Sequence, residues 1–244
     1  MEQIAAPIKL CLTTKCHIAK KALKIGEVGA GFDMRGFDLA GKTGIKDRSY
    51  YTEGLNACTG GVVIGNKLNM FHENSSLYDD AENAKRTIFP EFTNKILKMA
   101  QGAKEKIQVG LFGGWGYGSH KNVKEVEKSH NLFNSIALCI EEKLPEKEGI
   151  EVPLLTIWGK RNSKYPEAVY ARENTIILIS DLFKSLFKKK GECNLNREDL
   201  IKFLEEHYEE VQIPDNVNII AEETYKTPMG FMDNIKNKKL NLSA

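Results

Sequence analysis

Residues 57–72 constrain the fold of this chain more than any other segment, because their pattern is that of two strands joined by a tight turn. A β-branched run, Val62-Val63-Ile64, meets Gly65-Asn66, a pair typical of hairpin turns. A second apolar run follows from Leu68 to Phe71. Since side chains alternate between the two faces of a strand, the even-numbered residues share one face. These residues are Cys58, Val62, Ile64, Leu68, Met70 and His72.

The register of this hairpin decides whether Cys58 and His72 meet across it. A three-residue loop, Ile64-Gly65-Asn66, would place them directly opposite each other, with Cβ atoms about 4.5–5.5 Å apart. A two-residue loop, Gly65-Asn66, would put them on opposite faces, unless a bulge at Gly60-Gly61 restores the parity. The sequence is compatible with both registers.

The pair of Cys58 and His72 points to acyl-transfer chemistry. A thiol beside an imidazole is a nucleophile with its base, suited to amide hydrolysis, deamidation or transamidation. Thr52 is a candidate to orient the imidazole. Backbone N–H groups near Cys58 would stabilise the oxyanion, with Gly60 and Gly61 permitting the necessary bend. The alternative interpretation is a small buried cysteine and a strand-end histidine that share no task.

A glycine-rich loop over residues 113–118 follows a predicted buried strand over residues 107–112. Glycines in this loop would let a substrate backbone approach closely, because glycine has no side chain, and the aromatic residues would cover an apolar stem. A wide structural turn is the alternative explanation. The predicted substrate-binding residues are Gly113, Gly114, Trp115 and Tyr117.

The rest of the chain mixes strands with a few helices. Further strands are predicted at 152–158, 175–179 and 217–220, and helices from Pro90, over 123–144, over 181–190 and over 197–210 after the cap residue Asn196. We therefore predict an α+β fold: a β-sandwich-like core of mixed strands with helices packed on one side, plus a helical C-terminal extension. In this division, residues 1–50 form a loop-rich N-terminal region. Residues 50–180 form the core, and residues 181–244 form the extension, packed on the same domain.

Composition narrows the class of function. Over 244 residues, 35 basic and 33 acidic side chains leave a net charge of +2, which gives no attraction to nucleic acid. With no long apolar run and no secretory signal, we expect a cytoplasmic location without membrane insertion. Five widely spaced cysteines indicate reduced thiols. Cys11, Cys16 and His17 offer at most three metal ligands, so no metal is predicted. Three further histidines are expected to be surface or structural residues: His120, His130 and His207.

The order of the candidate residues resembles that of a known family, the chemoreceptor glutamine deamidases (CheD). The resemblance spans roughly residues 50–180. The element formed by the cysteine, the hairpin and the histidine is also similar to the catalytic core of cytotoxic necrotizing factor and related bacterial deamidase toxins. The matching positions are Thr52, Cys58, His72, Phe112-Gly113-Gly114 and the helix start at Asn122-Val123.

The resemblance implies a protein glutamine deamidase with Cys58 as nucleophile, His72 as base and Thr52 as its orienting partner, and with no cofactor. The partner would be a protein substrate with a reactive Gln. That substrate would be a receptor of the same cell, or a host regulatory protein if the chain is a bacterial effector delivered into a host cell. Two positions depart from the family: Asn56-Ala57 replaces its small step before the cysteine, and Lys121 replaces an arginine. A Cys–His peptidase or isopeptidase, and a non-catalytic binding module on the same fold, stay open.

Overall fold

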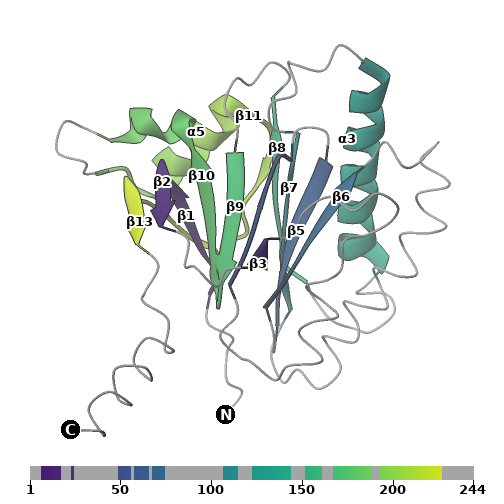
Figure 1. Ribbon diagram of the computed structural model, residues 1–244, viewed down its shortest axis with the longest axis horizontal. Helices are drawn as coiled ribbons and strands as arrows, with labels where there is room; N and C mark the ends of the chain where they lie inside the picture. The colour runs from purple at the N-terminus through teal and green to yellow at the C-terminus, as the bar shows by residue number, and fades with distance from the viewer. Residues whose placement is uncertain are drawn as a thin grey trace, which may run out of the picture.

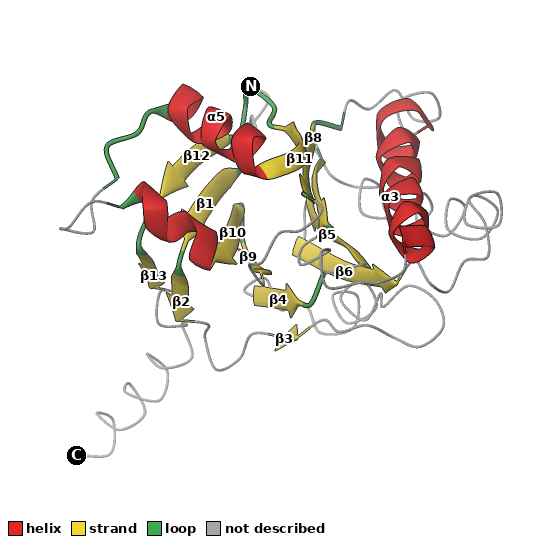
Figure 2. Cartoon of the chain, turned by 90° about the horizontal axis from the view of Figure 1, so that it is seen from above, coloured by secondary structure: helices red, strands yellow, loops and turns green. Residues whose placement is uncertain are grey.

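Two β-sheets pack face to face in the computed structural model (Figures 1 and 2). The structure describes residues 7–17, 23–24, 49–55, 58–65, 68–74, 107–114, 123–143, 152–160, 167–187 and 193–226. Within these ranges, no helix is both long and apolar enough to cross a membrane.

The first sheet has six strands, both parallel and antiparallel. Their order is β12 (Asn218–Ala221), β1 (Lys9–Thr13), β10 (Thr175–Ser180), β9 (Glu167–Arg172), β4 (Ser49–Glu53) and β3 (Leu23–Lys24). Strand β1 is parallel to both of its neighbours, whereas β9 is antiparallel to both β10 and β4. Both ends of the described chain therefore supply strands to this sheet.

The second sheet has five strands and contains the predicted hairpin. Their order is β11 (Tyr208–Gln212), β8 (Leu154–Gly159), β7 (Gln108–Gly113), β5 (Cys58–Ile64) and β6 (Leu68–Asn74). Only β7 and β8 are parallel to each other in this sheet. A separate parallel pair joins β2 (Lys15–His17) to β13 (Thr224–Lys226).

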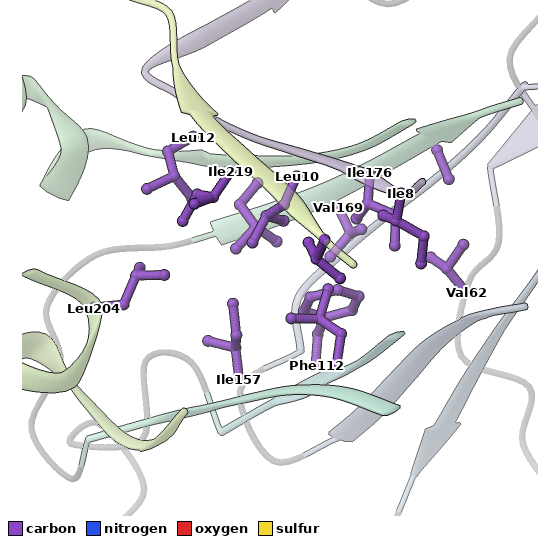
Figure 3. Close-up of a cluster of buried hydrophobic side chains, with 14 of the residues drawn as sticks. Ile8, Leu10, Leu12, Val62, Phe112, Ile157, Val169, Ile176, Leu204 and Ile219 are labelled. Atoms are coloured by element: carbon purple, nitrogen blue, oxygen red, sulfur yellow. The ribbon is translucent and has the colours of Figure 1, made fainter. Parts of the chain in front are cut away.

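The main hydrophobic core lies between the two sheets, as Figure 3 shows. It follows from the alternation of side chains: in β1, Leu10 and Leu12 face the second sheet, whereas Cys11 faces the other way and joins a separate cluster. Each fully buried aliphatic side chain contributes about 1.5–3 kcal/mol relative to an exposed one. Residues that meet in this core include Leu10, Leu12, Val62, Phe112, Ile157, Val169, Ile176 and Ile219.

Helix α3 (Val123–Leu138), continued by the π-helical turn η3 (Cys139–Lys143), covers the outer face of the five-stranded sheet (Figure 2). Its apolar side chains recur at helical spacing and bury against the odd-numbered side chains of β5, β6 and β7. The second core cluster includes Val63, Phe71, Val109, Leu111, Phe133, Ile136, Ile140 and Trp158.

Helix α5 (Arg197–His207) closes one side of the sandwich, where it lies against the edge strands β11 and β12 (Figure 2). The side chain of Asn196 caps it by accepting a 2.9 Å hydrogen bond from the Asp199 N–H. Leu200 and Leu204 reach the main core. The 3-10 helix η4 (Asp181–Leu186) adds Leu182, Phe183 and Leu186 to the same core.

The predicted fold class, α+β with a sandwich-like core of mixed strands, is confirmed. Three details differ. The helix predicted over 197–210 ends at His207, because Tyr208–Gln212 pairs with β8. The segment predicted as helical over 181–190 forms only the six-residue η4 within the described part. The regions predicted as loop-rich and as a helical extension also supply strands β1, β11 and β12, so strand pairing crosses both expected boundaries. The helix predicted from Pro90 lies outside the described residues.

Candidate active site

Cys58 is the first residue of β5, and its side chain faces the six-stranded sheet. Only 6% of the residue is exposed, and it belongs to the core cluster that contains Val62 and Met70. The candidate nucleophile is therefore set at the end of a strand and at the border of the packed core.

The hairpin adopts neither of the two predicted registers. Gly60 pairs with His72, and Cys58 pairs with Asn74. Cys58 and His72 nevertheless lie on the same face of the sheet, as diagonal neighbours. Diagonal neighbours are within reach of each other when one of them has an aromatic or long side chain. The bulge that one predicted register needs at Gly60-Gly61 is absent, since both residues pair in sequence.

Packing explains why this register forms. It sets Val62 opposite Met70 and Gly61 opposite Phe71. The Phe71 ring lies over Gly61 so closely that a Cβ atom on Gly61 would be 2.1 Å from two of its carbons. An aromatic ring that covers a glycine compensates for its missing side chain. A shift of this register would remove that cover.

Gly60 leaves the position opposite the His72 imidazole without a side chain. It stands between Cys58 and Val62 on the face that carries the candidate site, and it pairs directly with His72. A Cβ atom there would lie 2.9 Å from both terminal methyl carbons of Leu55, which is fully buried. The glycine therefore accommodates Leu55 against the strand, next to the histidine.

A hydrogen bond joins Thr52 to His72 across the two sheets. Thr52 Oγ1 and His72 Nδ1 are 2.7 Å apart, and both residues are buried. Thr52 is held in β4 by its pairing with Val169 of β9. Because Nδ1 is engaged by the hydroxyl, the imidazole has one defined orientation, with its buried Nε2 atom on the opposite edge of the ring. The contact that the family resemblance implies is present.

Two further cysteines, Cys11 and Cys16, have thiols with raised pKa values. Burial raises the pKa of Cys11 from 9.0 to about 12, and burial raises the pKa of Cys16 from 9.0 to about 11. Both stay protonated at neutral pH, which disfavours both nucleophilic attack and metal coordination by sulfur. Within the described ranges, no three His, Cys, Asp or Glu residues gather as a metal site.

Gly113 ends strand β7 and Gly114 follows it; both are buried. A Cβ atom on Gly113 would lie 2.6 Å from the Cys58 carbonyl oxygen, and Gly114 has a φ of +70°, in the left-handed region that favours glycine. These contacts and this backbone conformation explain why both positions require glycine for the fold itself. Their predicted contact with substrate stays a prediction, and Trp115 and Tyr117 lie outside the described residues.

The sequence did not single out Trp158, which lies two strands from Cys58 in the same sheet, on its opposite face. Its indole ring lies against Gly113 and Gly114 and stacks on His130, with ring centroids 5.2 Å apart. The only sequence signal was an aromatic residue at the end of a strand; its contact with the two glycines depends on the pairing of β7 with β8.

Two of the histidines that were expected to be surface or structural residues are described, and both bond to other residues of the fold. His130 bonds through Nε2 to the Glu210 carboxylate, and His207 Nδ1 is 2.8 Å from the Phe203 carbonyl oxygen. These contacts are compatible with the predicted structural role of both residues. His120 lies outside the described residues.

The structure places a thiol, an imidazole and a hydroxyl, from strands β5, β6 and β4, in the region between the two sheets, where their residues are almost entirely shielded from water. A histidine oriented by a hydroxyl can accept the thiol proton and return it to a leaving group, which is the chemistry of a cysteine nucleophile. Comparison with known proteins finds no family model that matches the chain and no significantly similar curated protein.

Proposed function

We propose that the protein is a glutamine deamidase that acts on the side chains of other proteins. The observation that carries this proposal is the buried 2.7 Å hydrogen bond between Thr52 and His72, on the sheet face that also carries Cys58. An imidazole oriented by a hydroxyl, on the same sheet face as a thiol, provides the three groups of a Cys–His–Thr triad. No cofactor is required for this chemistry.

The reaction proceeds in two steps. Cys58 Sγ attacks the carboxamide carbon of a Gln side chain while His72 accepts the thiol proton. The imidazolium then protonates the departing nitrogen, so that ammonia leaves and a thioester remains. In the second step, His72 takes a proton from water, and the hydroxide attacks the thioester. The products are a Glu side chain and the free thiol, which regains the proton.

In this cycle, Thr52 determines which nitrogen of His72 accepts and donates the proton. When Nδ1–H donates to the Thr52 hydroxyl oxygen, Nε2 carries the lone pair that accepts the proton. Backbone N–H groups near Cys58 are expected to stabilise the oxyanion that forms on the carboxamide.

The burial of the site favours a side-chain substrate over a peptide bond. His72 is 3% exposed and Cys58 is 6% exposed. A long, unbranched Gln side chain can reach a group below the surface, whereas a peptidase must hold an extended backbone against its nucleophile. This observation supports deamidation over the peptidase alternative. The target, a receptor of the same cell or a regulatory protein of a host cell, is identified by its modified Gln.

The test is to incubate the protein with a cell lysate in water labelled with heavy oxygen and to compare digested masses. Deamidation replaces a side-chain nitrogen by one labelled oxygen at a Gln and leaves the backbone whole. Cys58→Ser should abolish this labelling, whereas Cys193→Ser, at a partly exposed thiol of the same chain, should not. New chain termini that depend on Cys58 would show a peptidase, and an unchanged lysate would favour a binding module.

A further inference from the structure

Strand β7 connects the backbone of the proposed nucleophile to Trp158. Gly113 of β7 pairs with Thr59, the residue after Cys58, on one side and with Trp158 on the other. A Cβ atom on Gly113 would lie 2.6 Å from the Cys58 carbonyl oxygen and 2.5 Å from Trp158 Cζ3. One glycine therefore separates the nucleophile's backbone from the indole ring.

The indole also covers the point where β7 leaves the sheet. A Cβ atom on Gly114 would lie 2.5 Å from Trp158 Cε2, and Gly114 has a φ of +70°. Only glycine adopts this conformation without strain and lets the ring approach so closely. The position of the strand end therefore depends on the position of the ring.

The ring is itself fixed from the helix side. Trp158 is 1% exposed and stacks on the His130 imidazole at an interplanar angle of 20°. The Phe133 ring lies 4.8 Å away, centroid to centroid, at an angle of 51°. His130 Nε2 bonds to the Glu210 carboxylate of β11, so helix α3 and strand β11 hold the imidazole against the indole.

We infer that Trp158 is a positioning residue for Cys58. The inference rests on the proposed function. The indole belongs to the core cluster under helix α3, whereas the Cys58 side chain faces the other sheet. Trp158 therefore acts through the backbone, by holding Gly113 against the carbonyl of Cys58 and by covering Gly114, the next residue. A shift of about 1 Å at a reacting group can lower a rate about 100-fold, so the position of this strand end matters to the thiol.

The experiment measures the alkylation rate of Cys58 by iodoacetamide at neutral pH in the full chain, by peptide mapping, for Trp158→Leu, Trp158→Phe and Ile107→Ala. Ile107 belongs to the same core cluster as Trp158 and is 1% exposed, but it lies next to the opposite end of β7 from Gly113, so Ile107→Ala controls for lost packing. We expect Trp158→Leu to slow alkylation about tenfold and Trp158→Phe about threefold, and Ile107→Ala to stay within about twofold at an equal folded fraction. If Trp158→Leu does not fold, the comparison of Trp158→Phe with Ile107→Ala decides.

A double-mutant cycle with His72→Gln separates positioning from general destabilisation. If Trp158 acts by aligning Cys58 with His72, the loss caused by His72→Gln should shrink markedly in the Trp158→Leu chain, whereas independent effects would multiply. If His72→Gln does not slow alkylation of the otherwise unchanged protein, the proposed function fails and the inference falls with it. If His72→Gln does slow alkylation, but Trp158→Leu behaves like Ile107→Ala, only the inference is overturned.

Discussion

The Thr52 hydroxyl is the smallest group on which the proposed site depends. It is the partner of a buried His72 nitrogen, and an imidazole that loses such a partner can rotate or change tautomer. Because this hydrogen bond needs a hydroxyl at position 52, a substitution that keeps the shape of the side chain but removes the hydroxyl measures its contribution.

We predict that Thr52→Val lowers the rate of Gln conversion about tenfold, less than the loss of about 100-fold or more from His72→Ala. It should also lower the free energy of unfolding by about 1–3 kcal/mol, because valine leaves a buried ring nitrogen without its partner. Thr52→Ser retains the hydroxyl and serves as the control. Equal rates for Thr52→Val and the unchanged protein would remove Thr52 from the triad.

We predict that substoichiometric iodoacetamide at neutral pH labels Cys58 before the other thiols. Because burial raises the pKa of Cys11 to about 12 and that of Cys16 to about 11, these two form almost no thiolate at that pH. Their labelling should rise only as the pH approaches these values. Peptide mapping that found Cys193 labelled first and Cys58 inert would contradict the assignment of the nucleophile.

The same raised pKa makes stability depend on pH. Below pH 9.0 the Cys11 thiol is protonated in both the folded and the unfolded chain; between 9.0 and about 12 the unfolded chain releases the proton first. The free energy of unfolding should therefore fall as the pH rises through this window. Denaturant titrations should show a shallower fall for Cys11→Ala than for the unchanged protein, and parallel curves would refute the burial of an un-ionised thiol.

At the scale of elements, local pattern predicted the hairpin strands, β7, β10, α3 and the start of α5 well. Alternation and helical spacing are properties of neighbouring residues, so a single sequence carries them. The predicted end of α5 was wrong because Tyr208–Gln212 pairs with β8, and this tertiary contact overrides the local helical pattern. The hairpin register was wrong for the same reason: the cover of Gly61 by Phe71 depends on which residues face each other.

We predict that Asn196→Ala lowers the free energy of unfolding by about 1 kcal/mol, because it removes the oxygen that accepts from the Asp199 N–H at the start of α5. Asn196→Asp keeps an oxygen at this position and should stay close to the unchanged protein. Thermal unfolding followed by circular dichroism measures both. A loss as large for Asp as for Ala would mean that the cap does not stabilise this helix.

At the scale of the whole molecule, the two sheets draw strands from all parts of the described chain. Strand β1 lies between β10 and β12, and β11 completes the second sheet. The sequence predicted the strand at 217–220 but not its neighbour, since strand order is set by packing between distant segments. The position of Trp158 could not be predicted for the same reason, because strands β5, β7 and β8 must pair before its ring meets Gly113, next to the backbone of Cys58.

We predict that a chain ending at residue 180, the expected boundary of the core, does not unfold cooperatively. It lacks β11, β12 and α5, and with them the buried side chains of Leu200, Leu204 and Ile219. Both sheets would then expose an edge and part of the core. The full chain is the control, in chemical denaturation followed by fluorescence. A sharp transition of the shortened chain would show that residues 181–244 are a separable extension.

The hydrogen bond between Thr52 and His72 also has a consequence for when the candidate site can form during synthesis. The three candidate residues lie within a short stretch of sequence, yet the strands that hold them arrive much later: Thr52 pairs with Val169, and the sheet beside Cys58 needs Gly113 and Trp158. During synthesis, Thr52, Cys58 and His72 are therefore made early, but the strands that hold them in place are made only after most of the chain. If the proposed function is right, a nascent or unfolded chain should be inactive, and activity should begin only when the two sheets pack against each other.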